Sequence, residues 1–141
     1  MRNVFVPSDA VKVFFPKPSG ILRPYTLLAI EDQIVYQALA NVVAEHLHPH
    51  VKLRYNKQVF GNLYAGSRSG WFYRKWSDGY KAFNSSAEDA FREGYIWTAS
   101  FDLTAFYDSI DYKVLHYMLG KIGIDADFAA RLTAFLAQWT A

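Results

Sequence analysis

The chain has 141 residues, of which 52% are hydrophobic and 18% aromatic, so it is one domain in size and has ample apolar surface for a core. Its formal charge of +2 permits a nucleic-acid partner without requiring one. The lack of cysteine excludes disulfides and thiolate zinc sites. No signal peptide is visible and no apolar run approaches the roughly 20 residues that span a bilayer, so we expect a soluble, cytoplasmic protein without a membrane partner.

A strand, turn, strand unit is predicted near the start of the chain. Val11–Phe15 is apolar and ends at a proline-rich stretch, and a Ser-Gly pair supplies a turn before Ile21–Arg23. Val4–Val6 is predicted as a further short strand. The unit carries two cations, Lys17 and Arg23, which from composition alone would be ordinary solvated charges of a hairpin.

The most regular predicted helix is Glu31–Leu47, and Pro49 is expected to break it. Three alternating histidines near its end lack a carboxylate or thiol at the spacing of a zinc pattern. Interaction with the helix dipole therefore explains them more simply than a metal site. The apolar stripe of the helix is predicted to comprise Ile30, Ile34, Ala38, Val42 and Leu47, and the histidines are His46, His48 and His50.

Between Val51 and Lys81, cations are interleaved with aromatic rings, and Asp78 is the single acid. Cations can contact phosphates while rings stack on bases or sugars, so this mixture predicts a surface that follows a nucleic-acid backbone. The alternative is a set of core aromatics with solvated cations, and we expect most of the rings to be core. The predicted nucleic-acid-binding residues are Arg68, Arg74 and Lys75.

A central strand that ends in an acid is predicted in the second half of the chain. Ser85–Glu88 has the capping-box pattern and predicts a helix that ends near Gly94. The following segment, Tyr95–Phe101, is aromatic and β-branched, which favours a buried strand. Asp102 comes directly after it and is expensive to bury, so it needs a partner such as a divalent metal ion.

Two further helices complete the predicted elements. Asp111 is placed to cap a helix through about Leu119, and Asp125 to cap the last helix. The order of elements predicts a single α+β domain over residues 1–141, with a few mostly antiparallel strands against helices. Its partial sheet should leave an edge beside Tyr95–Phe101 that favours self-association. The apolar face of the last helix is predicted to comprise Phe128, Leu132, Phe135, Leu136 and Trp139.

Two segments of the sequence resemble motifs of one known protein family. They are Leu22–Leu39 and Asp102–Asp111. Asp102–Asp111 closely resembles the first catalytic palm motif of reverse transcriptases, particularly bacterial ones of the group II intron, retron and phage-defence types. Leu22–Leu39 is similar to the fingers motif of that family, in the family's order, and residues 60–68 loosely resemble the segment that leads into the palm. The resemblance covers roughly residues 12–120. It implies a partial right-hand polymerase fold: a fingers hairpin plus an incomplete palm with antiparallel strands packed on helices.

The resemblance implies an RNA-directed DNA polymerase, a nucleotidyltransferase that adds dNTPs to a DNA primer on an RNA template. Catalysis in that family uses two metal ions, Mg²⁺ or Mn²⁺. Asp102 matches the catalytic carboxylate and metal ligand, and the resemblance implies that the backbone carbonyl of Leu103 can be a second metal ligand. Arg23 matches the triphosphate-binding arginine, a role that a bidentate guanidinium suits. Lys17 is a looser match to its basic partner, and Tyr107 matches the aromatic that excludes a ribose 2′-hydroxyl.

The decisive departure from the family is in its second catalytic block. The second catalytic motif contains two consecutive aspartates, and no Asp-Asp pair occurs here. Asp108 and Asp111 are weaker candidates for further ligands, because Asp108 lies on a turn and Asp111 has the capping role. The template-grip motif and thumb are not found either, so we expect a truncated or split polymerase part, inactive without the missing palm and thumb segment. The alternatives are a binding module that grips nucleic acid or a partner without chemistry, and a non-functional fragment.

Overall fold

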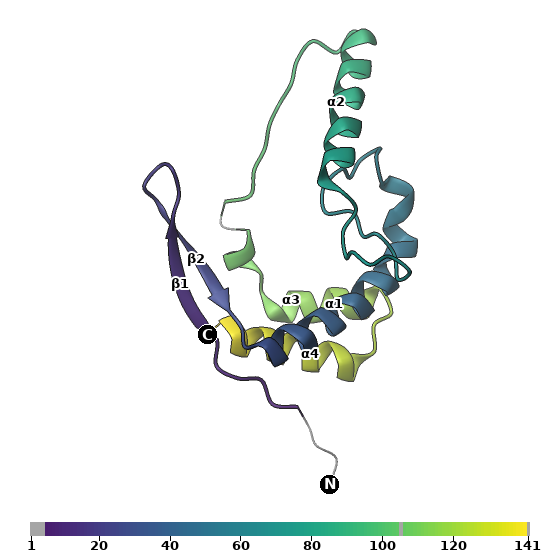
Figure 1. The fold of residues 1–141 in the computed structure, drawn as a ribbon. Coiled ribbons are helices and arrows are strands. Elements are labelled where there is room, and N and C mark those ends of the chain that lie inside the picture. The colour runs from purple at the N-terminus through teal and green to yellow at the C-terminus, as the bar shows by residue number, and fades with distance from the viewer. Residues whose placement is uncertain (1–4, 105, 141) are drawn as a thin grey trace. The chain divides into compact units, whose positions relative to one another are not determined.

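The computed structural model describes residues 5–104 and 106–140 and is a mixed α+β structure, as predicted. It has two compact units, unit 1 from residues 1–40 with 110–141 and unit 2 from residues 41–109. Within the described ranges no helix is long and apolar enough to cross a membrane. The elements are β1 (Val11–Pro16), β2 (Leu22–Leu27), α1 (Ile30–Val51), η1 (Lys52–Arg54), α2 (Trp76–Arg92), η2 (Tyr107–Ser109), α3 (Tyr112–Lys121) and α4 (Ala126–Thr140) (Figure 1).

The predicted N-terminal hairpin is confirmed. β1 and β2 pair antiparallel over their full lengths. The turn is closed by a hydrogen bond of 2.8 Å from the Lys17 amide to the Ile21 carbonyl, and Gly20 adopts the left-handed φ of 81° that glycine tolerates. Among the described residues this hairpin is the one sheet, so the expected palm sheet packed on helices is not formed there.

Helix α1 differs from its prediction in both length and face. It continues through Pro49 to Val51, because a proline in the last turn removes only one backbone hydrogen bond. The predicted stripe is wrong: Ile30 and Ile34 are 73% and 64% exposed, whereas Asp32 is 1% exposed. Apolar residues occur nearly all round this helix, so spacing alone does not select the buried face.

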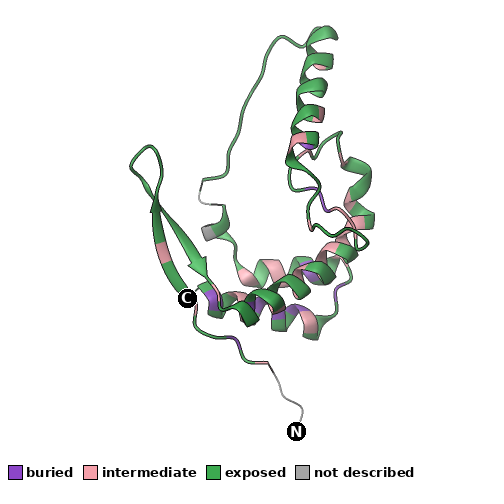
Figure 2. Ribbon diagram, in the orientation of Figure 1, coloured by how far each residue is buried: buried purple, intermediate pink, exposed green. Residues whose placement is uncertain are grey.

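Asp32 is the centre of unit 1. Its carboxylate accepts hydrogen bonds from the Ser8 amide, at 3.1 and 3.3 Å to its two oxygens, and from the Trp139 indole N–H at 3.1 Å. Beside it the Gln138 side chain donates to the Pro7 carbonyl at 2.8 Å. Helix α4 thereby ties the N-terminal segment to α1. The buried apolar residues of this unit are Leu119, Ile124, Ala129, Leu132 and Trp139 (Figure 2).

Both predicted aspartate caps are confirmed. The Asp111 carboxylate accepts the amides of Lys113 at 2.7 Å and Val114 at 3.4 Å, and Asp125 accepts the amide of Phe128 at 2.9 Å. Each cap satisfies amides that have no partner within their own helix. The predicted face of α4 is also confirmed, since all five of its residues are buried or half-buried.

Helix α2 begins at Trp76, well before the predicted start at Ser85. Its first turns can pack because Gly79 is buried directly against the carbonyl of Phe60. The capping-box serine therefore lies inside the helix and caps nothing. The spacing from Ser85 to Glu88 fits the capping pattern, but the helix already begins at Trp76, where its first turns pack against Phe60.

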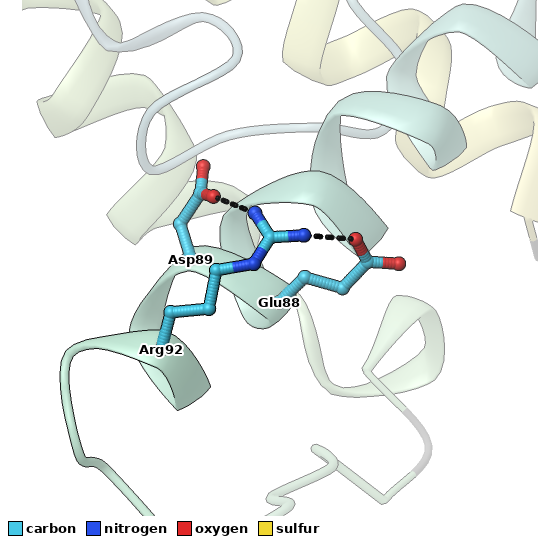
Figure 3. Close-up of polar contacts among 3 residues, drawn as sticks. All are labelled: Glu88, Asp89 and Arg92. Carbon is cyan, nitrogen blue, oxygen red and sulfur yellow. Dashed lines mark hydrogen bonds and ion pairs between the residues drawn. The ribbon is translucent and has the colours of Figure 1, made fainter.

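The end of α2 is close to its predicted position. Arg92 is the last helical residue, and Gly94 follows with a φ of 98°, the left-handed conformation common just after a helix. Arg92 also pairs with Asp89 at 2.8 Å and with Glu88 at 3.4 Å (Figure 3). All three side chains are exposed, so these pairs contribute little to stability.

The segment after α2 is extended but unpaired, so the predicted strand Tyr95–Phe101 is wrong for the chain as described. The Tyr95 amide bonds to the Ala90 carbonyl, and residues 96–102 make no backbone hydrogen bond to another described residue. A strand requires a neighbouring strand, and no other described segment offers one. Of the strand predicted at residues 4–6, residue 4 lies outside the described ranges and the other two belong to no strand.

Candidate functional site

The two cations predicted to bind phosphate lie near the closed end of the hairpin in unit 1. Arg23 stands opposite Phe15 in the register, and Lys17 begins the turn. Both are exposed, and neither forms an ion pair with any residue that the structure describes. Residues 10–30 contain no acid. The hairpin therefore offers unneutralised positive charge to an anionic ligand.

Aromatic packing orders the same face of the hairpin. Phe15 and Tyr25 pack edge to face, with 5.4 Å between their ring centroids. The register pairs Phe15 with Arg23 and Val13 with Tyr25, so all four residues share one face of the two-stranded sheet. Arg23 thus lies next to an ordered aromatic pair rather than on a bare loop.

Asp102 and Tyr107 belong to unit 2, on the segment that follows α2. Asp102 is exposed and makes no hydrogen bond or ion pair with a described residue, and Leu103 beside it is also exposed. Tyr107 begins η2, is 81% exposed and packs edge-on against Phe106 at 5.4 Å. Asp102, Leu103 and Tyr107 therefore present their side chains to solvent.

The residues present do not complete a two-metal centre. Over the described part of the chain, no three His, Asp or Glu side chains lie close enough together to hold one ion. Asp111 uses its carboxylate to cap α3, and the side chain of Asp108 lies outside what the structure describes. Asp102 and the Leu103 carbonyl alone are too few donors for two hydrated divalent ions.

A hairpin-like loop between η1 and α2 carries the predicted nucleic-acid-binding residues of unit 2. The Ala65 amide bonds to the Phe72 carbonyl at 2.9 Å, and the Arg74 amide to the Leu63 carbonyl at 2.8 Å. The two sides of the loop therefore run antiparallel, with one bridge between them. Residues 66–71, which we call the tip loop, connect these sides.

The tip loop presents a cation and an aromatic ring together. The Ser69 amide bonds to the Gly66 carbonyl at 3.0 Å, and the Ser69 hydroxyl accepts the Trp71 amide at 3.1 Å, which closes the turn. Trp71 is 80% exposed, and Arg68, three residues earlier in the same loop, is also exposed. Exposed tryptophan is costly in water, so this position favours a ligand with a planar, stackable group.

The base of this loop is an aromatic cluster. The Arg74 guanidinium lies over the Tyr55 ring, 5.3 Å from its centroid, and the Tyr55 hydroxyl accepts the Tyr64 amide at 3.3 Å. The His48 ring packs against both tyrosines, with centroids 5.7 and 5.6 Å away. Burial raises the pKa of Tyr64, and the Glu45 carboxylate and a hydrogen bond to it raise this pKa further.

No protein-family model, curated protein or solved structure matches this chain.

Two of the three predicted nucleic-acid-binding residues are exposed and form no ion pair with a described residue, and the third lies over an aromatic ring. Arg68 is on the tip loop and Lys75 precedes α2, whereas Arg74 is partly held by Tyr55. The expectation that most rings of this region are core is confirmed only in part, since Tyr64 is buried and three rings are half-buried, whereas three are exposed. The half-buried rings are Tyr55, Phe60 and Phe72, and the exposed ones are Trp71, Tyr73 and Trp76. Sequence reasoning did not single out Trp71, although its position after a Gly-Ser-Arg-Ser-Gly run is a turn signal.

Proposed function

We propose that this chain supplies the fingers and the first palm carboxylate of an RNA-directed DNA polymerase, which becomes active with a segment that carries the remaining acids. The observation that carries the proposal is the lack of a structural role for Asp102. Asp32, Asp111 and Asp125 each accept backbone or indole N–H groups, but Asp102 makes no hydrogen bond or ion pair with a described residue. An acid that holds nothing in place is available for a ligand.

The hairpin supports the same proposal from unit 1. Arg23 can bind phosphate oxygens with two parallel hydrogen bonds, and Lys17 can add a point charge, which suits the triphosphate of a dNTP. The acid-free sequence around them leaves this charge uncompensated. Tyr107 supplies an exposed ring whose bulk would exclude a ribose 2′-hydroxyl.

Primer extension tests the proposal. The 141-residue chain is incubated with an RNA template, a DNA primer, dNTPs and Mg²⁺, with and without the palm and thumb segment of a bacterial reverse transcriptase supplied in trans or as a fusion. We expect no extension by the chain alone and metal-dependent extension with the added segment. Asp102→Asn should reduce that extension by about 10³-fold or more, the size of loss typical for a group that stabilises developing charge.

Tyr107→Ala is the matched variant on the same segment. It should keep extension with dNTPs and gain extension with rNTPs, because it removes bulk without removing a carboxylate. Extension by the isolated chain, or full activity of the Asp102→Asn fusion, would contradict the proposal.

The tip loop favours a second function, nucleic-acid binding without chemistry. Arg68 and Lys75 can contact phosphates, and Trp71 can stack on an unpaired base. We expect weak binding to structured or single-stranded RNA, with affinity that falls as salt rises. The double reversal Arg68→Glu and Arg74→Glu should remove most of this binding and reduce the salt slope, as measured by fluorescence anisotropy from low to moderate salt.

Two further variants separate charge from stacking. Trp71→Ala should weaken binding by about tenfold with an unchanged salt slope, because stacking contributes roughly 1–3 kcal/mol per base. Lys113→Glu, an exposed charge reversal in α3 of unit 1, should leave binding unaltered. Salt-independent binding, or none at low salt, would be evidence against this function.

A further inference from the structure

The unpaired segment that follows α2 has an apolar side chain at every second position. Successive side chains of a strand point to opposite faces, so a paired strand here would have one apolar and one mostly polar face. Four of the apolar side chains, at positions 95, 97, 101 and 103, are 69%, 91%, 92% and 71% exposed. The apolar positions are Tyr95, Trp97, Ala99, Phe101 and Leu103, and the alternate ones are Ile96, Thr98, Ser100 and Asp102.

The backbone of this segment is also without partners. Residues 96–102 belong to no helix or strand and make no backbone hydrogen bond with the rest of the described chain. Figure 1 draws them as a plain trace that leaves the end of α2 without a neighbouring strand. Unpaired extended backbone with apolar side chains is a template for another strand.

We propose that this segment pairs antiparallel with the same segment of a second copy, with Ala99 opposite Ala99 at the two-fold axis. In this register Trp97 faces Phe101 of the second copy, and Tyr95 faces Leu103. The contact is therefore self-complementary, as a two-fold interface requires.

Other registers are poorer. A shift by one residue places the apolar face of one strand with the polar face of the other, because opposite residues share a face. A shift by two keeps the faces but places one of the outer apolar residues of each copy opposite a position beyond the segment. The centred register uses all five apolar positions and places the small Ala99 between the rings of Trp97 and Phe101.

The available surface is of the size that an interface needs. Tyr95, Trp97 and Phe101 can each bury on the order of 150–250 Å². A two-stranded ribbon is marginal without a helix on its apolar face, and α2 of the same unit has an exposed stripe that includes Trp76 and Phe91, at 79% and 68%. The three rings of each copy thus supply on the order of 450–750 Å², against the roughly 800 Å² per partner of a standard interface. This inference does not depend on the proposed polymerase function.

Cysteine cross-linking tests the register directly, because the natural chain has no cysteine. Residues that face each other across antiparallel strands have Cα atoms about 4.5–5.5 Å apart, within disulfide range. Ala99→Cys should therefore form a covalent dimer with itself under mild oxidation. Thr98→Cys and Ser100→Cys should each fail alone, because the copies of each residue lie about 7–8 Å apart on the diagonal, but a mixture of the two should cross-link.

Ser67→Cys, on the exposed tip loop, measures collisional cross-linking. An Ala99→Cys rate no higher than that of Ser67→Cys would overturn the proposal. So would equal cross-linking of Thr98→Cys alone and in the mixture, since the register would then not be fixed.

Sedimentation equilibrium measures the association of the unmodified chain. Trp97→Lys should raise the dimer dissociation constant at least about 100-fold, because both copies lose a buried ring. Thr98→Lys, one residue away on the polar face, should change it by less than about tenfold. Both side chains are exposed in the single chain, so far-ultraviolet circular dichroism should stay unchanged. A monomer at all concentrations, or equal effects of the two substitutions, would contradict a second copy as the partner.

Discussion

Asp32→Ala should lower the free energy of unfolding by about 3 kcal/mol. The substitution leaves the buried Trp139 indole N–H and the part-buried Ser8 amide without their acceptor, and an unsatisfied buried donor costs about 1–3 kcal/mol. Domains of this size are stable by only about 5–15 kcal/mol, so the change is a large fraction of the total. Urea denaturation followed by circular dichroism measures it.

Asp32→Asn is the matched control. The carboxylate oxygen Oδ1 accepts both donors, at 3.1 Å each, and an asparagine oxygen in that place can do the same. We therefore expect a loss of about 1 kcal/mol or less, since the charge has no cationic partner to lose among the described residues. An Asp32→Ala variant within 1 kcal/mol of the natural chain would show that this network does not hold unit 1 together.

Gly79→Ala should destabilise unit 2 by about 1–3 kcal/mol, the cost typical of overpacking. A Cβ at this position would collide with the carbonyl oxygen of Phe60, which is backbone and cannot rotate away. Separation of α2 from the preceding turn would also weaken the ring contact between Phe60 and Phe83, whose centroids are 5.6 Å apart. Thermal or urea unfolding of the two proteins gives the difference.

Gly120→Ala in α3 is the control, because it changes helix propensity in the same way but creates no collision. No atom lies within 4 Å of a Cβ built there, so alanine should gain its usual helix advantage of up to about 1 kcal/mol. Opposite signs for the two glycines are the expected result. Stabilisation by both substitutions would mean that α2 does not approach Phe60 as closely as described.

Local sequence signals predicted the elements that depend on local interactions. Asp111 and Asp125 cap their helices because the cap needs only amides two or three residues away. Gly20 and Gly94 mark a turn and a helix end because only the backbone conformation of one residue is involved. The hairpin that carries Lys17 and Arg23 was also predicted, because its turn depends on neighbouring residues.

Features that depend on distant partners were not predictable from spacing. The buried face of α1 is selected by Asp32, whose partners lie 24 and 107 positions away in the chain. The start of α2 depends on Gly79 meeting Phe60, which the capping pattern at Ser85 does not include. Tyr95–Phe101 has strand propensity but no neighbouring strand among the described residues, and propensity measures a fit to a sheet that must already exist.

Unit 1 combines residues 1–40 with residues 110–141, so it can fold only after unit 2 has been synthesised. Unit 2 is one continuous stretch, residues 41–109, whereas unit 1 needs residues 110–141 to join residues 1–40. Unit 2 can therefore fold on the ribosome before Trp139 is synthesised and can bond to Asp32. The early hairpin and α1 must remain soluble through that interval, with exposed Phe14, Phe15 and Ile34 available to chaperones. Pausing of translation late in the chain should prolong this exposure and increase aggregation of the nascent protein.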